Sequence, residues 1–280
     1  MAQAASFQTP MELERIARQV RATVIELSHK GQSPHLGSSL SCVDILVACH
    51  FAVLNIDPGH LDDPHRDRFI LSKGHAAIAL YATLAHRGYF DRAMLIRDYN
   101  KDGGSIPEQP APHCLPGVEL ATGSLGHGMG LAVGMAYADR SLRADCDIYV
   151  VLSDGELQEG STWENMMMAA NLGVDRVVAF LDHNGSQSFG HTRETHPKFY
   201  PIREKIEAFG WESAEVDGHD PAAIGRAVTA RRGGRPFMLI ANTVKGRGVS
   251  FMEHQPIWHY RSPTAAEYAQ AIADLTKDGR

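Results

Sequence analysis

The spacing of apolar residues changes between two periods along the chain. From Met11 to Lys30, behind Pro10, apolar residues recur every three or four positions, which predicts an amphipathic helix. Residues 147–153 and 176–182 are instead nearly continuous apolar runs. Such runs are typical of strands that are buried on both faces of a sheet. The segment between them, 159–173, has the character of a helix.

The rest of the chain alternates in the same way. Further strands are predicted at 68–72, 211–216 and 237–244. Further helices are predicted at 42–54, 74–88, 199–210 and 221–233, and residues 123–139 are predicted to be a glycine-rich loop that opens a packed helix. We expect Ser41 to cap the helix that follows it, and Gly88 and Gly210 to end theirs. Segments 31–39 and 100–118 are rich in glycine and proline and predict loops.

This order of elements predicts the fold class. Strands that alternate with helices indicate an α/β protein with a doubly wound, mostly parallel sheet flanked by helices. We find no internal repeat and no clear boundary, so residues 1–280 are expected to form a single domain. Residues 263–280 are expected to form a terminal helix.

Composition excludes several classes of protein. The 280 residues are 44% hydrophobic and 21% charged, as in an ordinary globular protein. A net charge of -6 without a basic run argues against a nucleic-acid surface. No apolar stretch reaches the length of a membrane span, and the N-terminus does not resemble a signal peptide. The four cysteines show no metal-binding spacing, so a cytoplasmic protein with reduced thiols is expected.

Two strand ends carry the first candidate chemistry. Asp154-Gly155 follows one buried run and Asn184 follows the next. If one crossover helix joins the two strands, these side chains converge at the carboxyl edge of the sheet, where such folds bind ligands. Their oxygens suit Mg²⁺ or Ca²⁺, and either ion would hold a diphosphate. The alternative is a turn aspartate and a loop asparagine without a shared role.

Acidic residues follow the first strand end closely. Glu156, Glu159 and Glu164 lie at the start of the predicted helix, whose positive end favours them. They could order the surroundings of a metal ion. For Glu156, simple helix capping is the alternative.

Four segments together resemble one enzyme family. The sequence SDGELQEGSTWE followed by LDHN is similar to the thiamine diphosphate motif of transketolases. The other three segments are SPHLGSSLS, FILSKGHAAIALYATLA and LPGVELATGSLGHGMGLAVGMA. The resemblance runs in order from about residue 12 to about residue 262. Other thiamine diphosphate enzymes share the Asp-Gly and Asn pair but not the SKGH segment.

The resemblance implies a set of ligands for thiamine diphosphate. Asp154, Asn184 and the backbone carbonyl of Ser186 would bind the divalent ion, Mg²⁺ or Ca²⁺. Glu159 and Glu164 would belong to an acidic network that joins paired cofactor sites. The residues implied to contact or surround the cofactor are His75, Gly123, Ser124, Leu125, Gly155, Glu156, Glu159, Glu164 and His254.

Histidines are the implied catalytic residues. Ketol transfer moves protons on and off sugar hydroxyls, and imidazole titrates nearest to neutral pH. His35 and His75 would face the substrate hydroxyls. Either His259 or His254 would be the late histidine of the family. The cofactor carries the difficult electronic step, so the protein needs no nucleophile of its own.

Two positions depart from the family pattern. Pro110 stands where the family has the histidine of a Gly-His-Pro triplet, and His113 is a candidate to reach the same space. His127 replaces the usual glutamine of the glycine loop. Both changes lie near the expected substrate channel. We therefore expect a specialised ketose, such as a branched or sulfonated sugar.

The resemblance covers only the first part of a full-length transketolase. The chain is expected to be an N-terminal subunit that works with a separate C-terminal subunit, which carries the pyrimidine-binding domain, in an α2β2 assembly. Two alternatives remain open from the sequence. One is a subunit of a thiamine-dependent 2-oxoacid dehydrogenase or decarboxylase. The other is a cofactor-binding subunit without catalysis.

Overall fold

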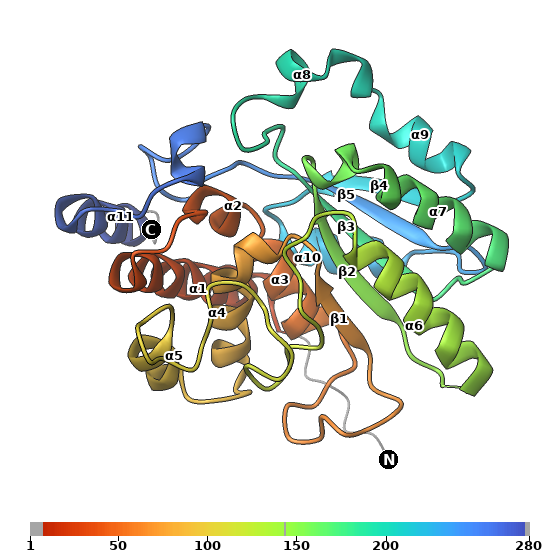
Figure 1. Ribbon diagram of the computed structural model, residues 1–280, viewed down its shortest axis with the longest axis horizontal. Coiled ribbons are helices and arrows are strands. Elements are labelled where there is room, and N and C mark those ends of the chain that lie inside the picture. Colours follow the sequence, from red (N-terminus) through yellow and green to blue (C-terminus); the bar gives the residue numbers. More distant parts are fainter. Residues whose placement is uncertain (1–7, 143, 278–280) are drawn as a thin grey trace.

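Five parallel strands form the sheet at the centre of the protein. The computed structural model describes residues 8–142 and 144–277, and within them the strand order is β1-β2-β3-β5-β4 (Figure 1). The strands are β1 (Arg68–Leu71), β2 (Ile148–Ser153), β3 (Val177–His183), β4 (Glu212–Asp217) and β5 (Phe237–Asn242). All four pairings in this sheet are parallel. The predicted α/β fold class is thus confirmed.

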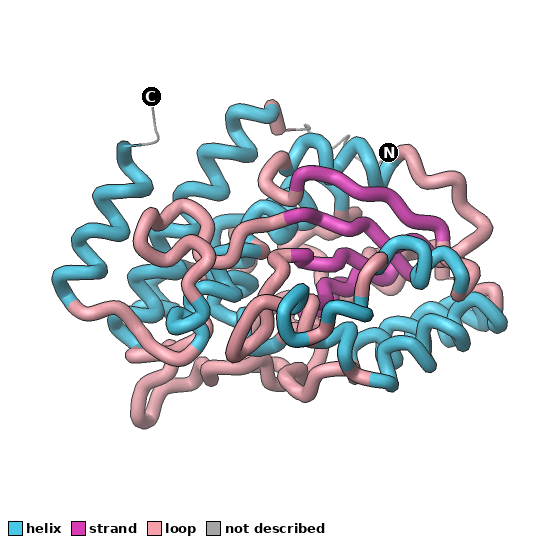
Figure 2. Tube along the Cα trace, turned by 90° about the horizontal axis from the view of Figure 1, so that it is seen from above, coloured by secondary structure: helices cyan, strands magenta, loops and turns pink. Residues whose placement is uncertain are grey.

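Helices cover both faces of the sheet (Figures 1 and 2). One core contains side chains of α1 (Pro10–Gly31), α3 (Val43–Ala48), α4 (Ala77–Arg87) and α10 (Pro221–Thr229). The other contains those of α6 (Gly128–Leu142), α7 (Gly160–Leu172) and α9 (Ile202–Ala208). The remaining helices are α2 (Leu36–Ser41), α5 (Arg92–Asp98), α8 (Thr192–Thr195) and α11 (Ala265–Lys277).

The position of the central strand β2 explains why its sequence is continuously apolar. All six of its residues are buried, and successive side chains point to opposite faces. Tyr149 and Val151 pack into the first core, while Ile148, Val150 and Leu152 pack into the second. The strand β4, at one edge, is only partly buried, so its sequence mixes polar and apolar residues.

The predicted boundaries hold for most elements. The helix α1 starts at Pro10 with a capping box between Thr9 and Glu12. Gly88 and Gly210 follow α4 and α9 with φ of 92° and 88°. The helix α11 lies within the predicted 263–280, whose last three residues fall outside the described part of the chain.

Some local predictions were wrong. The loop predicted at 31–39 becomes helical at Leu36, and all six residues of α2 are buried. Burial overrides the low helix propensity of its serine and glycine residues. Ser41 caps nothing, because its hydroxyl donates to Ser38 O and Asp182 Oδ2 instead. The helix predicted at 42–54 divides into α3 and a π-helical turn, Cys49–Val53, and α5 and α8 were not predicted.

No helix within residues 8–142 and 144–277 combines the length and the apolar character that a membrane span needs. Three of the four cysteines are buried, and none of the four is in a disulfide.

His50 makes the first core sensitive to acid. Its ring packs edge-on against Phe69 with centroids 4.7 Å apart, and neither ring nitrogen has a partner among the described residues. Burial lowers the pKa of His50 to about 3, whereas the unfolded chain titrates near 6.5. The unfolded state therefore binds more protons below pH 6.5, and stability falls as the pH falls from there towards 3.

Substitution His50→Leu should remove this share of the acid sensitivity. Between pH 6.5 and pH 5, His50 is expected to cost about 2 kcal/mol of unfolding free energy. Denaturant unfolding of the wild type and the variant at both pH values measures the difference. An equal loss in the two proteins would show that His50 is not the titrating group.

Candidate functional site

A polar cavity of about 400 Å³ opens at the carboxyl edge of the sheet. Lys73 follows β1, Ser153 ends β2, Asn184 follows β3 and Lys245 follows β5, so four strand ends supply its wall. The residues that line it are His35, Ser38, Lys73, His75, Gln109, Gly123, Leu125, Ser153, Gly155, Gln158, Glu159, Asn184, Ser186, Gln187, Ser188, Phe189, Lys245 and His259.

Asp154 and the turn after β3 meet as the sequence predicts. Asp154 is fully buried, and its Oδ2 accepts a hydrogen bond of 2.5 Å from Gly185 N. The side chain of Asn184 accepts from Ser186 N at 3.0 Å. These bonds shape a turn that places Asn184 and Ser186 in the cavity wall beside the carboxylate.

The cavity has room for a ligand beside a hydrogen-bond acceptor that the protein does not use. Asp154 Oδ1 is buried without a hydrogen-bond partner among the described residues. Burial raises the pKa of Asp154 to about 7, so a nearby cation would restore its charged form. Gly155 has an ordinary φ of -63°, and a Cβ there would meet only Gln187 at 3.7 Å. A side chain at Gly155 would therefore take up cavity space instead of clashing with protein.

Three histidines gather on the other side of the cavity. The ring centroids of His35 and His259 are 4.7 Å apart, and that of His75 lies 5.3 Å from His35 and 5.5 Å from His259. His35 N donates to His259 O at 3.1 Å, which ties the loop before α2 to the C-terminal part of the chain. Ser38 Oγ lies 3.2 Å from His259 Nδ1.

All three imidazoles are expected to be neutral at pH 7. Burial lowers the pKa of His259 to about 3, with help from the positive charge of Lys245. Burial also lowers the pKa of His35, and it holds that of His75 well below 6.5, where Lys73 adds to the effect. A neutral imidazole carries one donor and one acceptor nitrogen, so each ring can exchange a hydrogen bond with a hydroxyl.

Two lysines line the cavity. Lys73 is fully buried and pairs with Asp182, and its ammonium also donates to Ser38 O at 3.0 Å. Lys245 Nζ donates to Gln187 O at 3.0 Å, and burial beside Lys73 lowers the pKa of Lys245 to about 8. Because Asp182 pairs with Lys73, Lys245 is the lysine that remains available to an anionic ligand.

The glycine loop closes a third side. Gly123 and Leu125 line the cavity, and Gly123 has a φ of 139°. A Cβ at Gly123 would lie only 1.9 Å from Gln109 Oε1, so no larger residue fits without moving that side chain. Glu156 lies beneath the loop, where it accepts from Gly126 N at 3.0 Å and from Ser72 Oγ. It fixes the loop and does not line the cavity.

Several predicted site residues lie elsewhere. His113, Ser124 and Glu164 are exposed and are not part of the cavity wall, whereas Glu159 is exposed at its rim. His254 is also exposed, so of the two candidates for the late histidine only His259 faces the cavity.

The position of the missing histidine is filled in a different way. Pro110 is buried outside the cavity, and its carbonyl accepts from Thr122 N at 3.3 Å. Gln109 lines the wall, and Glu108 Oε1 lies 3.7 Å from His35 Nε2. His127 is exposed at the start of α6.

Comparison with known proteins assigns the family. Residues 13–274 match the model of the transketolase, thiamine diphosphate binding domain. The chain belongs to the transketolase family.

Two of its relatives match it over almost their full length. The 6-deoxy-6-sulfo-D-fructose transketolase subunit SqwG of Clostridium sp. (strain MSTE9) is 38% identical, over 96% of this chain and 98% of that protein. One subunit of the apulose-4-phosphate transketolase of Actinobacillus succinogenes is 39% identical, over 94% of this chain and 96% of that protein. This transketolase chain therefore resembles proteins that are named as subunits.

Solved transketolases share the fold but are longer. The transketolase from Leishmania mexicana superposes with a TM-score of 0.88 at 27% identity, over 94% of this chain and 41% of that chain. This chain thus corresponds to about two fifths of that enzyme. The family model, the relatives and the solved structure described here are all transketolases, which argues against the alternative of a 2-oxoacid dehydrogenase subunit.

Sequence reasoning missed three charged residues of this transketolase site, namely Lys73, Lys245 and Asp182. Lys73 and Lys245 follow strand ends, and Asp182 lies near the end of β3. The rule that strand ends converge could have found all three. They were overlooked because a lone lysine or aspartate at a strand end is common in any α/β protein.

Proposed function

We propose that the chain is the N-terminal subunit of a split, thiamine diphosphate-dependent transketolase. It would transfer a two-carbon ketol unit from a ketose to an aldose acceptor, together with a separate C-terminal subunit. One observation carries the proposal. In a single cavity, the turn that Asp154 holds, with Asn184 and Ser186, lies opposite three neutral histidines. A diphosphate anchor and a proton-transfer surface are the two parts that this half of such an enzyme must supply.

The residues present fit the cofactor's diphosphate end. Asp154, Asn184 and the carbonyl of Ser186 would hold a divalent ion, because hard oxygen ligands suit Mg²⁺ or Ca²⁺. The unpartnered Asp154 Oδ1 supports this assignment. Gly155 and His75 would lie along the diphosphate, with Lys245 adding positive charge. When bound, thiamine diphosphate supplies the electron sink that lets the carbon–carbon bond of the ketose break.

The histidines would bind and orient the sugar. Neutral His35 and His259 can each accept a proton from a hydroxyl and, once protonated, return it, so that ketol transfer can run in both directions. The hydroxyl of Ser38 would orient the ring of His259 through a hydrogen bond with His259 Nδ1. Glu108 is a candidate to orient His35 in the same way, since its carboxylate lies 3.7 Å from His35 Nε2. Catalytic roles for His113 and His254 are not supported by their exposed positions.

A partner subunit would complete the site. Apolar side chains on α6 and α7 remain exposed although the two helices pack beside β2, the strand that Asp154 follows, namely Leu131 (40%), Tyr137 (45%), Met167 (46%) and Met168 (45%). Exposed apolar residues of this size gather at protein interfaces. Glu159 and Glu164 lie on the same side, at the start of α7. We propose an α2β2 assembly in the cytoplasm, with each active site between two chains.

The donor is proposed to be a specialised sugar. The two relatives described above are named for a sulfonated ketose and for apulose 4-phosphate. Pro110 stands where the family's histidine is expected but is buried outside the cavity, while Gln109 lines the wall, so the wall would differ from that expected for pentose phosphates.

Steady-state kinetics of the assembled enzyme should show this preference. We expect kcat/KM on 6-deoxy-6-sulfo-D-fructose or a branched ketose phosphate to exceed that on xylulose 5-phosphate by at least about 10-fold, since one lost hydrogen-bond partner costs on the order of 1–3 kcal/mol. Full efficiency on xylulose 5-phosphate would sink the idea of a specialised donor while leaving the transketolase activity intact.

A further inference from the structure

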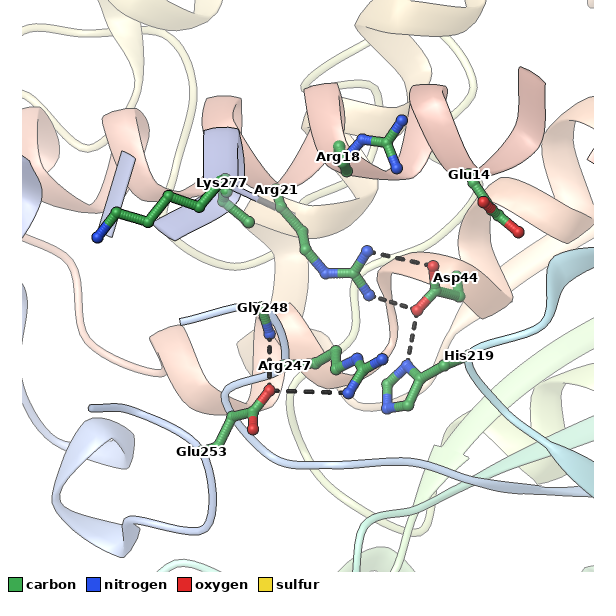
Figure 3. Close-up of a pocket in the computed structure, with 10 residues that line it drawn as sticks. Glu14, Arg18, Arg21, Asp44, His219, Arg247, Gly248, Glu253 and Lys277 are labelled. Carbon is green, nitrogen blue, oxygen red and sulfur yellow. Dashed lines mark hydrogen bonds and ion pairs between the residues drawn. The ribbon is translucent and has the colours of Figure 1, made fainter. Parts of the chain in front are cut away.

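A second and larger cavity lies away from the transketolase site. It measures about 630 Å³ and opens between α1, α11 and the loop after β5 (Figure 3). None of its lining residues lines the cavity at the carboxyl edge of the sheet. We call it the basic pocket, after Arg18, Arg21, Arg247 and Lys277 in its wall.

The basic pocket contains cationic groups that the protein leaves partly unused. Arg21 is buried and forms an ion pair with Asp44, yet its Nε has no partner within the described part of the chain. Arg18 is half-buried, and among residues 8–142 and 144–277 its side chain takes part in no hydrogen bond or ion pair. The guanidinium of Arg247 forms a loose pair with Glu253, at 3.8 Å, and no other ion pair with the residues that the structure describes. A buried, unsatisfied guanidinium N–H is costly unless a ligand completes it.

The pocket wall defines the chemistry of a ligand. Three guanidinium groups match the geometry of a phosphate, sulfonate or carboxylate. Each guanidinium can donate two hydrogen bonds at once to two oxygens of such a group. Glu14 and Glu253 also line the pocket and could accept hydrogen bonds from hydroxyl groups. The volume is typical of sites for small metabolites. A hydroxylated molecule that carries an anionic group fits both kinds of wall.

A chain of hydrogen bonds leads from the basic pocket to the transketolase site. Arg21 binds Asp44, and Asp44 Oδ2 lies 2.7 Å from His219 Nδ1 (Figure 3). Val244 N donates to His219 Nε2 at 2.8 Å, so Nδ1 carries the proton and donates to Asp44. The next residue, Lys245, lines the transketolase cavity.

We propose that the basic pocket binds a small hydroxylated metabolite with a phosphate, sulfonate or carboxylate group, and that this ligand changes the cofactor affinity of the transketolase site. The anion would compete with Asp44 for Arg21. The bond between Asp44 and His219 would then rearrange, and with it the backbone that positions Lys245. The binding step stands by itself, whereas the effect on the cofactor rests on the proposed function.

Calorimetry on the full chain tests the binding step. The probes are inorganic phosphate and 6-phosphogluconate, which carries a phosphate, a carboxylate and hydroxyls. We expect saturable binding, weakened by at least about 10-fold in the double variant R18A/R247A, as the loss of charge-assisted hydrogen bonds implies. The matched control is Arg15→Ala, which removes an exposed arginine on the same helix whose side chain donates a hydrogen bond to Gln19. It should bind the probes like the wild type.

Different outcomes test the binding site, the coupling and the proposed function separately. No saturable binding, or equal binding by wild type and R18A/R247A, would overturn the site, provided that circular dichroism shows the variant to be folded. The coupling is tested by measuring thiamine diphosphate affinity with and without 6-phosphogluconate. We expect a change of at least about 3-fold in the wild type and none in R18A/R247A, since such coupling is reciprocal. An unchanged affinity overturns the coupling, while failure of the wild type to bind thiamine diphosphate at all would instead count against the proposed function.

Discussion

Substitution Asp154→Ala is expected to weaken binding of thiamine diphosphate with Mg²⁺ by at least about 100-fold and to abolish activity of the assembled enzyme. The reason is that Asp154 offers the only charged oxygen in the proposed metal site, and removal of even the supporting partners of a metal ligand typically costs about 10–100-fold. Its Oδ1 is buried and free to accept the ion. Fluorescence or calorimetric titration with cofactor and Mg²⁺ measures the effect.

Two matched variants make this test specific. Asp154→Asn keeps the shape of the side chain and can still accept from Gly185 N, so it should fold but bind the metal poorly. Asp102→Ala removes an exposed aspartate in a loop and should change nothing. If Asp154→Asn bound cofactor and metal as well as the wild type, the proposed ligand set would be wrong.

Substitution His259→Ala should lower kcat/KM for ketol transfer by about 10²–10⁴-fold, the usual contribution of general acid–base catalysis. His259 faces the cavity and contacts His35 and Ser38, whereas His254, five residues earlier, is exposed outside it. His254→Ala is therefore the matched control, and we expect it to retain at least about half of the activity. Steady-state kinetics of both variants in the assembled enzyme gives the comparison.

Cofactor affinity distinguishes a catalytic role from a structural one. If His259 acts on the sugar, the variant should bind thiamine diphosphate within about 3-fold of the wild type while its turnover collapses. Equal activity of the His254 and His259 variants would contradict the assignment. A larger loss in His254→Ala would reverse it.

Much of the fold could be predicted because β2 and β3 are buried on both faces, and few structures besides a central strand produce such short, continuous apolar sequences. The convergence of Asp154 and Asn184 followed from the parallel order of these strands. The helix α2 could not be predicted in the same way. Its serines and glycine favour a loop by propensity, and burial against the rest of the chain makes them helical.

The candidate site was predicted in its centre and less well at its edges. His35, His75 and His259 lie together, but His113 and His254 do not join them. Closeness along the sequence does not decide which way a side chain faces, and both His113 and His254 are exposed outside the cavity. Lys73 and Lys245 are 172 positions apart in the sequence. They line the same cavity because the strands that they follow end at the same edge of the sheet.

Reconstitution tests most directly whether this chain is one half of a split transketolase. Ketol transfer is assayed with thiamine diphosphate and Mg²⁺ for this purified chain, for the purified C-terminal transketolase subunit, and for their mixture. We expect no turnover above background for either chain and robust activity for the mixture, lost again when this chain carries Asp154→Ala. Full activity of this chain without a partner, or a mixture that stays inactive on every ketose while both chains are folded and bound, would contradict it.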